Sequence, residues 1–466
     1  MKVHRFTLYG FAAWAVLLVY FASRDVDALW LSLILTPILG ALLAVAIWRR
    51  HQVLALFLAF ALIAHAVAPP FFFMRREFYT YGGGFGAVKD FQFGVEELLR
   101  MYVGVLLFLA ATVVFTLLIP RRTRAAAERT ATPGVDIGAG LPPRLRTLCG
   151  AGLALFLLAV ALPASLFMYN ARVGITGIEP PVLAYRMTGI LTYFRMFLVP
   201  ALILIGCGLS NRGVALSLVV LFYAFVAGFA SASRFIAVAS AAPLVVFAMM
   251  DRRMLRFAIS VAAGAIFLLV TGSRNFVYVR RMPLVELIAT TVRESKAEDF
   301  SPFDLVGGIA NRVWGPQDVV LASQYHVPSR IDAIRRFFSG QPVVEDIVQE
   351  FYGMKIPEDA AFGVGLGYIP WMIVLANGSI AVLLLLAAVT AVFLSISQML
   401  VDLYRASRVR TLAAAAPPLA FFLVYLLLPA TLNWWTYAAV LAAAGLVVPG
   451  VLRRLAGAAG SGALTR

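Results

Sequence analysis

Long apolar runs separated by short polar connections recur along most of the chain. A helical membrane span needs about 20 mostly apolar residues to cross a hydrocarbon core of roughly 30 Å. The pattern predicts about twelve spans, at residues 6–22, 28–48, 53–73, 101–119, 148–168, 189–209, 214–231, 235–250, 257–271, 366–400, 411–431 and 434–452. The run 366–400 is too long for one straight helix and fits a re-entrant piece followed by a span. We therefore expect an all-α, polytopic membrane protein.

Composition and charge agree with this interpretation. Hydrophobic residues make up 62% of the chain, charged residues only 13%, and the mean hydropathy is +0.90, which excludes an ordinary soluble domain. With the N-terminus placed inside, 20 lysines and arginines face the cytoplasm against four acids, and the other side has no net charge. The net charge of +16 is therefore a topology signal that places both termini in the cytoplasm, and it requires no nucleic-acid partner.

Cysteine and histidine usage predicts neither a disulfide framework nor a metal site. Cys149 and Cys207 both fall inside spans, and the four histidines are scattered along the sequence. The first apolar run lacks a convincing cleavage site and reads as a retained span. We expect no metal and no cofactor.

Three long connections divide the chain. They suggest a four-span N-terminal segment (1–119), a cytoplasmic linker (120–147), central spans (148–271), a large outer loop (272–365), and C-terminal spans with a tail (366–466). The outer loop contains stretches such as "RIDAIRRFF", with apolar residues at helical spacing and charges between them. These predicted helices either lie on the membrane surface or plug the top of the bundle.

Arginines from separate segments are expected to meet at the outer boundary of the membrane. The stretches "LTYFRMFLVP", "AGFASASRFI" and "TGSRNFVYVRR" supply Arg195, Arg234, Arg274, Arg280 and Arg281. A charged residue inside a span is costly unless it faces a wet cavity or a counter-ion. The spans contain almost no acids, so a phosphate-bearing ligand fits the arginines, and small neighbours such as Ser233 and Ser273 let a bulky head group approach. Snorkelling to phospholipid head groups and pairing with acids of the outer loops are the alternatives.

These segments also carry a family resemblance. The stretches "FASASRFIAV", "TGSRNFVYVRR" before one large loop, and "FGVGLGYIPWMIVLANGSIAVLLLL" after it resemble the Wzy-type oligosaccharide repeat-unit polymerases and, more distantly, the O-antigen ligases. The resemblance implies a GT-C-like fold in the bacterial inner membrane. It also implies transfer of a growing glycan from undecaprenyl pyrophosphate to an incoming lipid-linked repeat unit at the periplasmic face. Membrane lipids and a chain-length regulator are further expected partners.

The family pattern is carried over residue by residue. Arg234 and Arg274 match its arginine positions, whereas Arg280, Arg281 and Arg312 in "GGIANRVWG" match more loosely. Arg195 is a candidate on physical grounds alone. His326 is the candidate for the base that takes the acceptor proton. Arg330 departs from the family's arginine-glycine spacing, which puts a role for it in doubt.

Other functions fit parts of the sequence. An O-antigen ligase would use the same donor, and a lipid-linked oligosaccharide flippase would need the same membrane setting. A flippase usually has an internal repeat, which is not evident in this chain. A metal-dependent GT-C enzyme would use acids in the first outer loop, where Asp25 and Asp27 lie. A purely structural membrane subunit is the remaining alternative.

Overall fold

The computed structural model describes residues 2–75, 77–78, 89–90, 94–119, 142–171, 187, 190–191, 194–210, 213–230, 286, 319–320, 322–323, 329–339 and 368–406. These residues are almost entirely helical, as the apolar runs predict. One antiparallel pair departs from the all-α expectation: β1 (Glu77–Phe78) pairs with β2 (Lys89–Asp90).

The N-terminal helices form one group. They are α1 (Lys2–Arg24), α2 (Val26–Trp48), α3 (Gln52–Leu62), the π-helical turn η1 (Ile63–Val67), α4 (Ala68–Arg75) and α5 (Val95–Leu118). The Asp25 carboxylate caps the start of α2 by accepting hydrogen bonds from the backbone N–H groups of Asp27 (2.8 Å) and Ala28 (3.1 Å). Buried positions of α2 such as Leu31, Leu35 and Leu39 recur at helical spacing.

Two helices from much later in the sequence join this group. They are α20 (Tyr368–Ala376) and α21 (Ile380–Ala406), separated by a turn in which Asn377 and Gly378 have left-handed φ values of 45° and 76°. The Tyr368 hydroxyl lies 2.7 Å from the Thr390 hydroxyl. This hydrogen bond folds α20 back along the first turns of α21. The run 366–400 is therefore broken into a short helix and a long one, as its length indicates.

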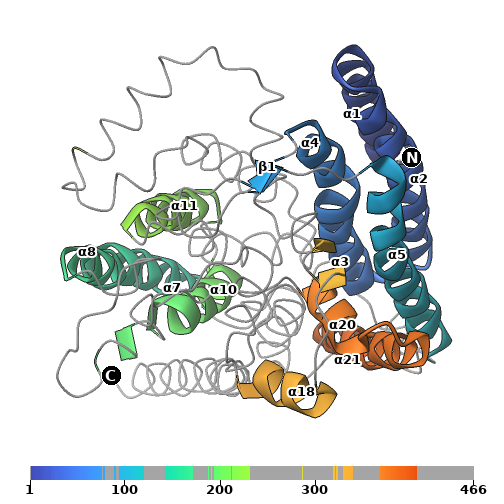
Figure 1. Ribbon diagram of the computed structural model, residues 1–466. Helices are drawn as coiled ribbons and strands as arrows, with labels where there is room; N and C mark the ends of the chain where they lie inside the picture. Colours follow the sequence, from blue (N-terminus) through green and yellow to red (C-terminus); the bar gives the residue numbers. More distant parts are fainter. Residues whose placement is uncertain are drawn as a thin grey trace, which may run out of the picture.

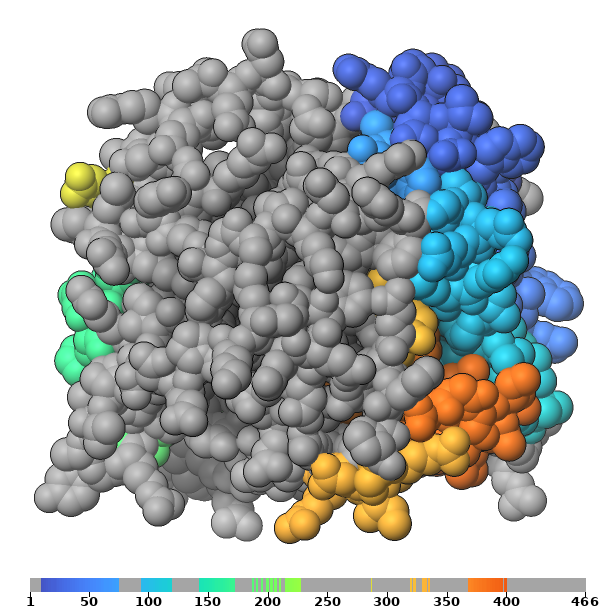
Figure 2. Space-filling view, in the orientation of Figure 1, coloured from blue at the N-terminus to red at the C-terminus, as the bar shows by residue number. Residues whose placement is uncertain are grey.

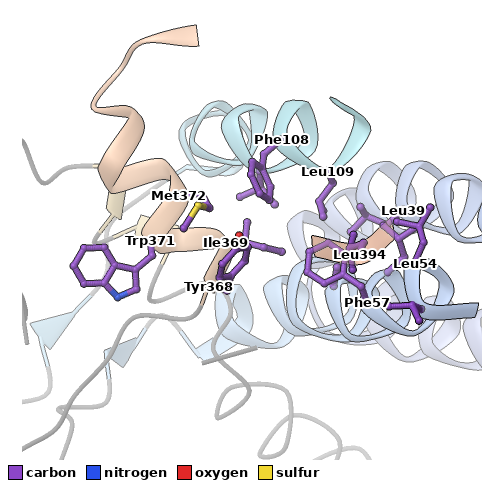
Figure 3. Packing of buried hydrophobic residues seen from close by; sticks show 14 of the residues in the cluster. Leu39, Leu54, Phe57, Phe108, Leu109, Tyr368, Ile369, Trp371, Met372 and Leu394 are labelled. Carbon is purple, nitrogen blue, oxygen red and sulfur yellow. The ribbon is translucent and has the colours of Figure 1, made fainter. Parts of the chain in front are cut away.

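The core between these helices joins distant parts of the sequence. Figure 3 shows Phe108 of α5 above Tyr368 of α20, with ring centroids 6.5 Å apart. Leu394 of α21 lies close to Leu54 and Phe57 of α3 in the same view. In lipid, such packing and buried hydrogen bonds hold helices together, because apolar surface gains little by leaving an apolar solvent.

The second group is built from the central helices. They are α7 (Pro143–Phe156), η2 (Leu157–Ala161), α8 (Leu162–Asn170), η4 (Phe194–Leu198), α10 (Val199–Leu209) and α11 (Gly213–Ala230). Figure 1 shows α7, α8, α10 and α11 together on the side of the molecule opposite to α1 and α2. The Cβ that an alanine would place at Gly206 of α10 falls 2.5 Å from a methyl carbon of Leu153 on α7, so these two helices cross at close range.

Each of the three π-helical turns within the described residues ends two residues before a proline. The turns η1, η2 and η4 precede Pro69, Pro163 and Pro200 respectively. A proline has no N–H, and its ring collides with the carbonyl four residues earlier. Adding one residue to the preceding turn relieves this conflict: the Ala68 N–H bonds to the Ile63 carbonyl, and the Leu162 N–H to the Leu157 carbonyl.

Four helical stretches of the described chain are long and apolar enough to cross a membrane: Val26–Trp48, Gln52–Met74, Val95–Leu118 and Pro143–Asn170. Shorter apolar helices lie at Gly10–Arg24, Val214–Ala227 and Ile380–Ile396. The helix expected at 101–119 begins earlier, at Val95, where Glu96 and Glu97 favour a helix start. The last residues of the predicted 120–147 linker belong to α7. The predicted spans 235–250, 257–271, 411–431 and 434–452 lie outside the described residues.

Candidate functional site: a buried arginine among three helices

Arg195 is the one sequence-predicted site residue that lies within the described part of the chain. Arg234, Arg274 and His326, together with Arg280, Arg281, Arg312, Ser233 and Ser273, lie outside it. Arg195 is therefore the centre of the candidate site.

Arg195 is enclosed by protein. It is the second residue of η4, and only 2% of its surface is exposed. An arginine that snorkels to the membrane surface keeps its guanidinium in water, so this degree of burial argues against that alternative. A guanidinium held at such depth needs polar surroundings to offset the loss of its hydration.

The polar surroundings of Arg195 include a hydroxyl group from another helix. Tyr223 of α11 is fully buried, and its hydroxyl lies close enough to Arg195 for the guanidinium charge to act on it. The same hydroxyl lies beside the side chain of Ser165 on α8. Arg195 of η4 and Tyr223 of α11 thus lie within electrostatic range of each other, and Ser165 of α8 lies near Tyr223.

Ser165 is held in position by its own helix. Its hydroxyl donates a 2.9 Å hydrogen bond to the carbonyl of Ala161, the last residue of η2. The oxygen of Ser165 keeps its acceptor capacity for a neighbouring donor. Because Pro163 produces η2, the local sequence "VALPASLF" sets both the wide turn and the place of this hydroxyl.

The backbone around Arg195 is set in a similar way. Pro200 follows η4, and the extra residue in that turn changes which side of the helix Arg195 occupies. The rings of Phe194, at the start of η4, and Phe156, the last residue of α7, lie 6.0 Å apart. This aromatic contact and the close crossing of α7 and α10 fix the segment that carries the guanidinium.

A buried guanidinium with a phenol hydroxyl in its vicinity is suited to binding an anion. The planar guanidinium can donate two parallel hydrogen bonds to phosphate oxygens, and a phenol hydroxyl can add a third donor. Among the described residues, no group of three potential ligands is placed to hold a metal ion. Of the two acids that a metal-dependent enzyme would use, Asp25 serves as the N-cap of α2 and Asp27 lies in its first turn.

Two residues of this site were missed from the sequence. Tyr223 and Ser165 are isolated polar residues in apolar spans, and a serine there usually bonds to its own helix. Only the packing of α8 and α11 brings Ser165 near Tyr223 and Tyr223 within range of the Arg195 charge. Arg330 has a structural position instead: it donates a long hydrogen bond of 3.4 Å to the carbonyl of Ala376, at the end of α20.

Comparison with known proteins adds no relative to this picture. No family model, curated protein or solved structure matches the chain.

Proposed function

We propose that the chain is a bacterial inner-membrane glycosyltransferase that polymerises undecaprenyl-pyrophosphate-linked oligosaccharide repeat units at the periplasmic face. The proposal takes the twelve-span topology, the cytoplasmic termini and the GT-C-like fold from the sequence. The observation that carries it is the enclosed guanidinium of Arg195 in an apolar helix group, where its charge reaches the buried hydroxyl of Tyr223.

In the proposed reaction, the acceptor hydroxyl of one repeat unit attacks the anomeric carbon of the donor glycan. The new carbon–oxygen bond forms as the bond from the anomeric carbon to the pyrophosphate oxygen breaks. Undecaprenyl pyrophosphate leaves with the bonding electrons, and a base takes the acceptor proton, for which His326 is the candidate. Fixed guanidinium groups lower the barrier by stabilising the charge that develops on the leaving group.

Arg195 would act with the other predicted arginines rather than alone. In the predicted topology, Arg234, Arg274, Arg280 and Arg281 reach the same membrane boundary as the segment that carries Arg195, and Arg312 belongs to the adjacent loop. A pyrophosphate offers several oxygens, so donors from different helices can share it. Tyr223 and Ser165 would supply neutral donors and acceptors at its edge.

The first experiment identifies the reaction through the lipid-linked glycans of a deletion strain. A polymerase predicts loss of polymer, with glycans carrying a single repeat unit surviving. Accumulation of long lipid-linked polymer would instead indicate the ligase alternative. Failure of repeat units to cross the membrane would indicate a flippase.

The second experiment tests Arg195 by complementing the deletion strain. Arg195→Lys keeps the charge but loses the planar fork, and we expect lost polymer with normal membrane insertion. Arg100→Lys is the matched control, because Arg100 is exposed and pairs with Glu96 at 2.7 Å on the surface of α5. Full activity of Arg195→Lys would count against pyrophosphate binding by this residue.

A further inference from the structure

The predicted outer loop contains one described helix on which two apolar side chains, Ile331 and Ile334, are exposed. This helix is α18 (Arg330–Ser339), and Ser329 caps it by accepting a 3.4 Å hydrogen bond from the Asp332 N–H. Ile331 is 81% exposed and Ile334 is 44% exposed. These isoleucines are three residues apart, so they lie on one face of the helix.

The helix is attached to the membrane-spanning part of the protein. Arg330, its first residue, donates to the Ala376 carbonyl at the C-terminal end of α20. A cation at this end of a helix also interacts favourably with the helix dipole. The contact places α18 beside the Asn377–Ser379 turn, where α20 gives way to α21. Figure 2 shows α18 at the edge of the molecule, next to the surface of the α20–α21 region.

The exposed face of α21 starts at that same turn. Ile380, at the turn itself, is 63% exposed. Leu385 is also 63% exposed and starts an apolar stripe that Val389, Val392 and Ile396 continue along the helix. The opposite stripe, which includes Leu383, Ala387 and Leu394, is buried against the protein. In a membrane helix, an exposed apolar stripe of this kind faces lipid acyl chains. The exposed isoleucines of α18 therefore lie at one end of a lipid-facing surface.

The charges of α18 indicate how it would meet the lipid. Arg335 is exposed one position after Ile334, and the helix contains Arg330, Arg335 and Arg336 against the single acid Asp332. Short amphipathic helices with apolar residues on one face and arginines beside them lie in the plane of the membrane interface. A helix that plugged the top of the bundle would bury its isoleucines against other helices, which is the reverse of what is observed.

We propose that α18 is an interfacial anchor that inserts Ile331 and Ile334 into the head-group and acyl boundary of the membrane. Arg330 ties this anchor to the end of α20. The position of α20 is thereby coupled to the depth of α18 in the lipid. The proposal does not depend on the enzymatic function proposed above.

The test uses single cysteines in the full-length protein reconstituted in lipid nanodiscs. The variants Ile331→Cys, Ile334→Cys and the control Asp332→Cys are made with Cys149 and Cys207 replaced by alanine, and each is labelled with an environment-sensitive fluorophore. Asp332 is exposed but lies on the other side of the helix, so it reports the water-facing side. Because all three side chains are exposed, these substitutions should leave the fold intact, which gel filtration checks.

We expect nitroxide-labelled lipids to quench positions 331 and 334 several-fold more strongly than position 332. Aqueous iodide should quench in the opposite order. Equal quenching of all three positions by iodide would place the helix in water and overturn the proposal. Protection of 331 and 334 from both quenchers would show that protein covers them, as with a second copy or another chain, and would overturn it as well.

Discussion

The side-chain oxygen of Gln398 accepts a 3.1 Å hydrogen bond from the backbone N–H of Val53, across 345 residues of sequence. Val53 lies in the first turn of α3, where N–H groups have no partner within the helix. The neighbouring N–H of Leu54 donates to Nδ1 of His51 at 3.1 Å. The start of α3 is thus capped by its own preceding residue and by a side chain from α21, and both of these side chains are buried.

Gln398→Leu should destabilise the protein by about 1–3 kcal/mol, because it leaves the buried N–H of Val53 without this partner. The measurement is thermal unfolding of the purified protein in detergent. Met399→Leu is the control, since Met399 is 43% exposed on the same helix and should change the unfolding temperature little. Equal unfolding temperatures for the two variants would show that the Gln398 contact contributes no stability.

Gly206→Ala should weaken the crossing of α7 and α10, because the new methyl group would meet Leu153 at 2.5 Å. Overpacking of this kind costs about 1–3 kcal/mol. Gly152→Ala is the control on α7: no atom lies within 4 Å of its added Cβ, so it should be neutral or stabilising by up to about 1 kcal/mol. Leu153→Ala in the Gly206→Ala background should recover part of the loss in a thermal unfolding assay. Absence of any recovery would contradict the contact.

Tyr223→Phe should reduce polymer formation by about tenfold or more if its hydroxyl helps Arg195 to bind a pyrophosphate. A hydrogen bond to a charged group contributes about 1.5–3 kcal/mol, and each 1.4 kcal/mol changes a rate tenfold. The assay measures glycan polymer made by reconstituted protein from a lipid-linked repeat unit. Tyr102→Phe is the control, because Tyr102 is equally buried but belongs to the N-terminal helix group. Equal losses in both variants would point to a general packing effect.

Pro200→Ala should allow η4 to return to an ordinary α-helical turn. Loss of one residue from the wide turn rotates the preceding residues by roughly 100° about the helix axis, which would carry Arg195 away from Tyr223. We expect polymer formation to fall as it does in Arg195→Lys, with normal membrane insertion. Pro69→Ala alters the corresponding turn in the N-terminal group and should leave activity largely intact. Full activity of Pro200→Ala would show that the π-helical turn is not needed to position Arg195.

The positions of helices could be predicted from the sequence, because an apolar run of span length has few other stable structures in a membrane. Within the eight predicted spans that reach the described residues, the described residues are helical apart from Ile119 and the turn at 377–379. The length of the run 366–400 predicts a break in the helix. The structure has a turn there, in which Asn377 and Gly378 adopt left-handed φ values. The prolines now explain the π-helical turns, but a proline alone does not require one: Pro37 lies inside α2, which is α-helical throughout.

The partners of individual side chains could not be predicted in the same way. Arg195 was found because an arginine in an apolar run is rare, whereas Tyr223 and Ser165 depend on how α8 and α11 pack. From the sequence, a functional role for Arg330 is in doubt because its spacing to the next glycine departs from the family pattern. Its observed partner is a backbone carbonyl 46 residues away, which no local pattern reports.

The packing of α21 on α5 and α3 has a consequence for biosynthesis. The ribosome synthesises α3 and α5 hundreds of residues before α21. The first spans therefore enter the bilayer before α21 can cover its face of α5 and before Gln398 can accept the hydrogen bond from the Val53 N–H. Maturation of the N-terminal spans is then a late event that depends on insertion of the last described helix. A nascent chain arrested before that helix would expose the surfaces of α3 and α5 that α21 normally covers, and membrane proteases could recognise them.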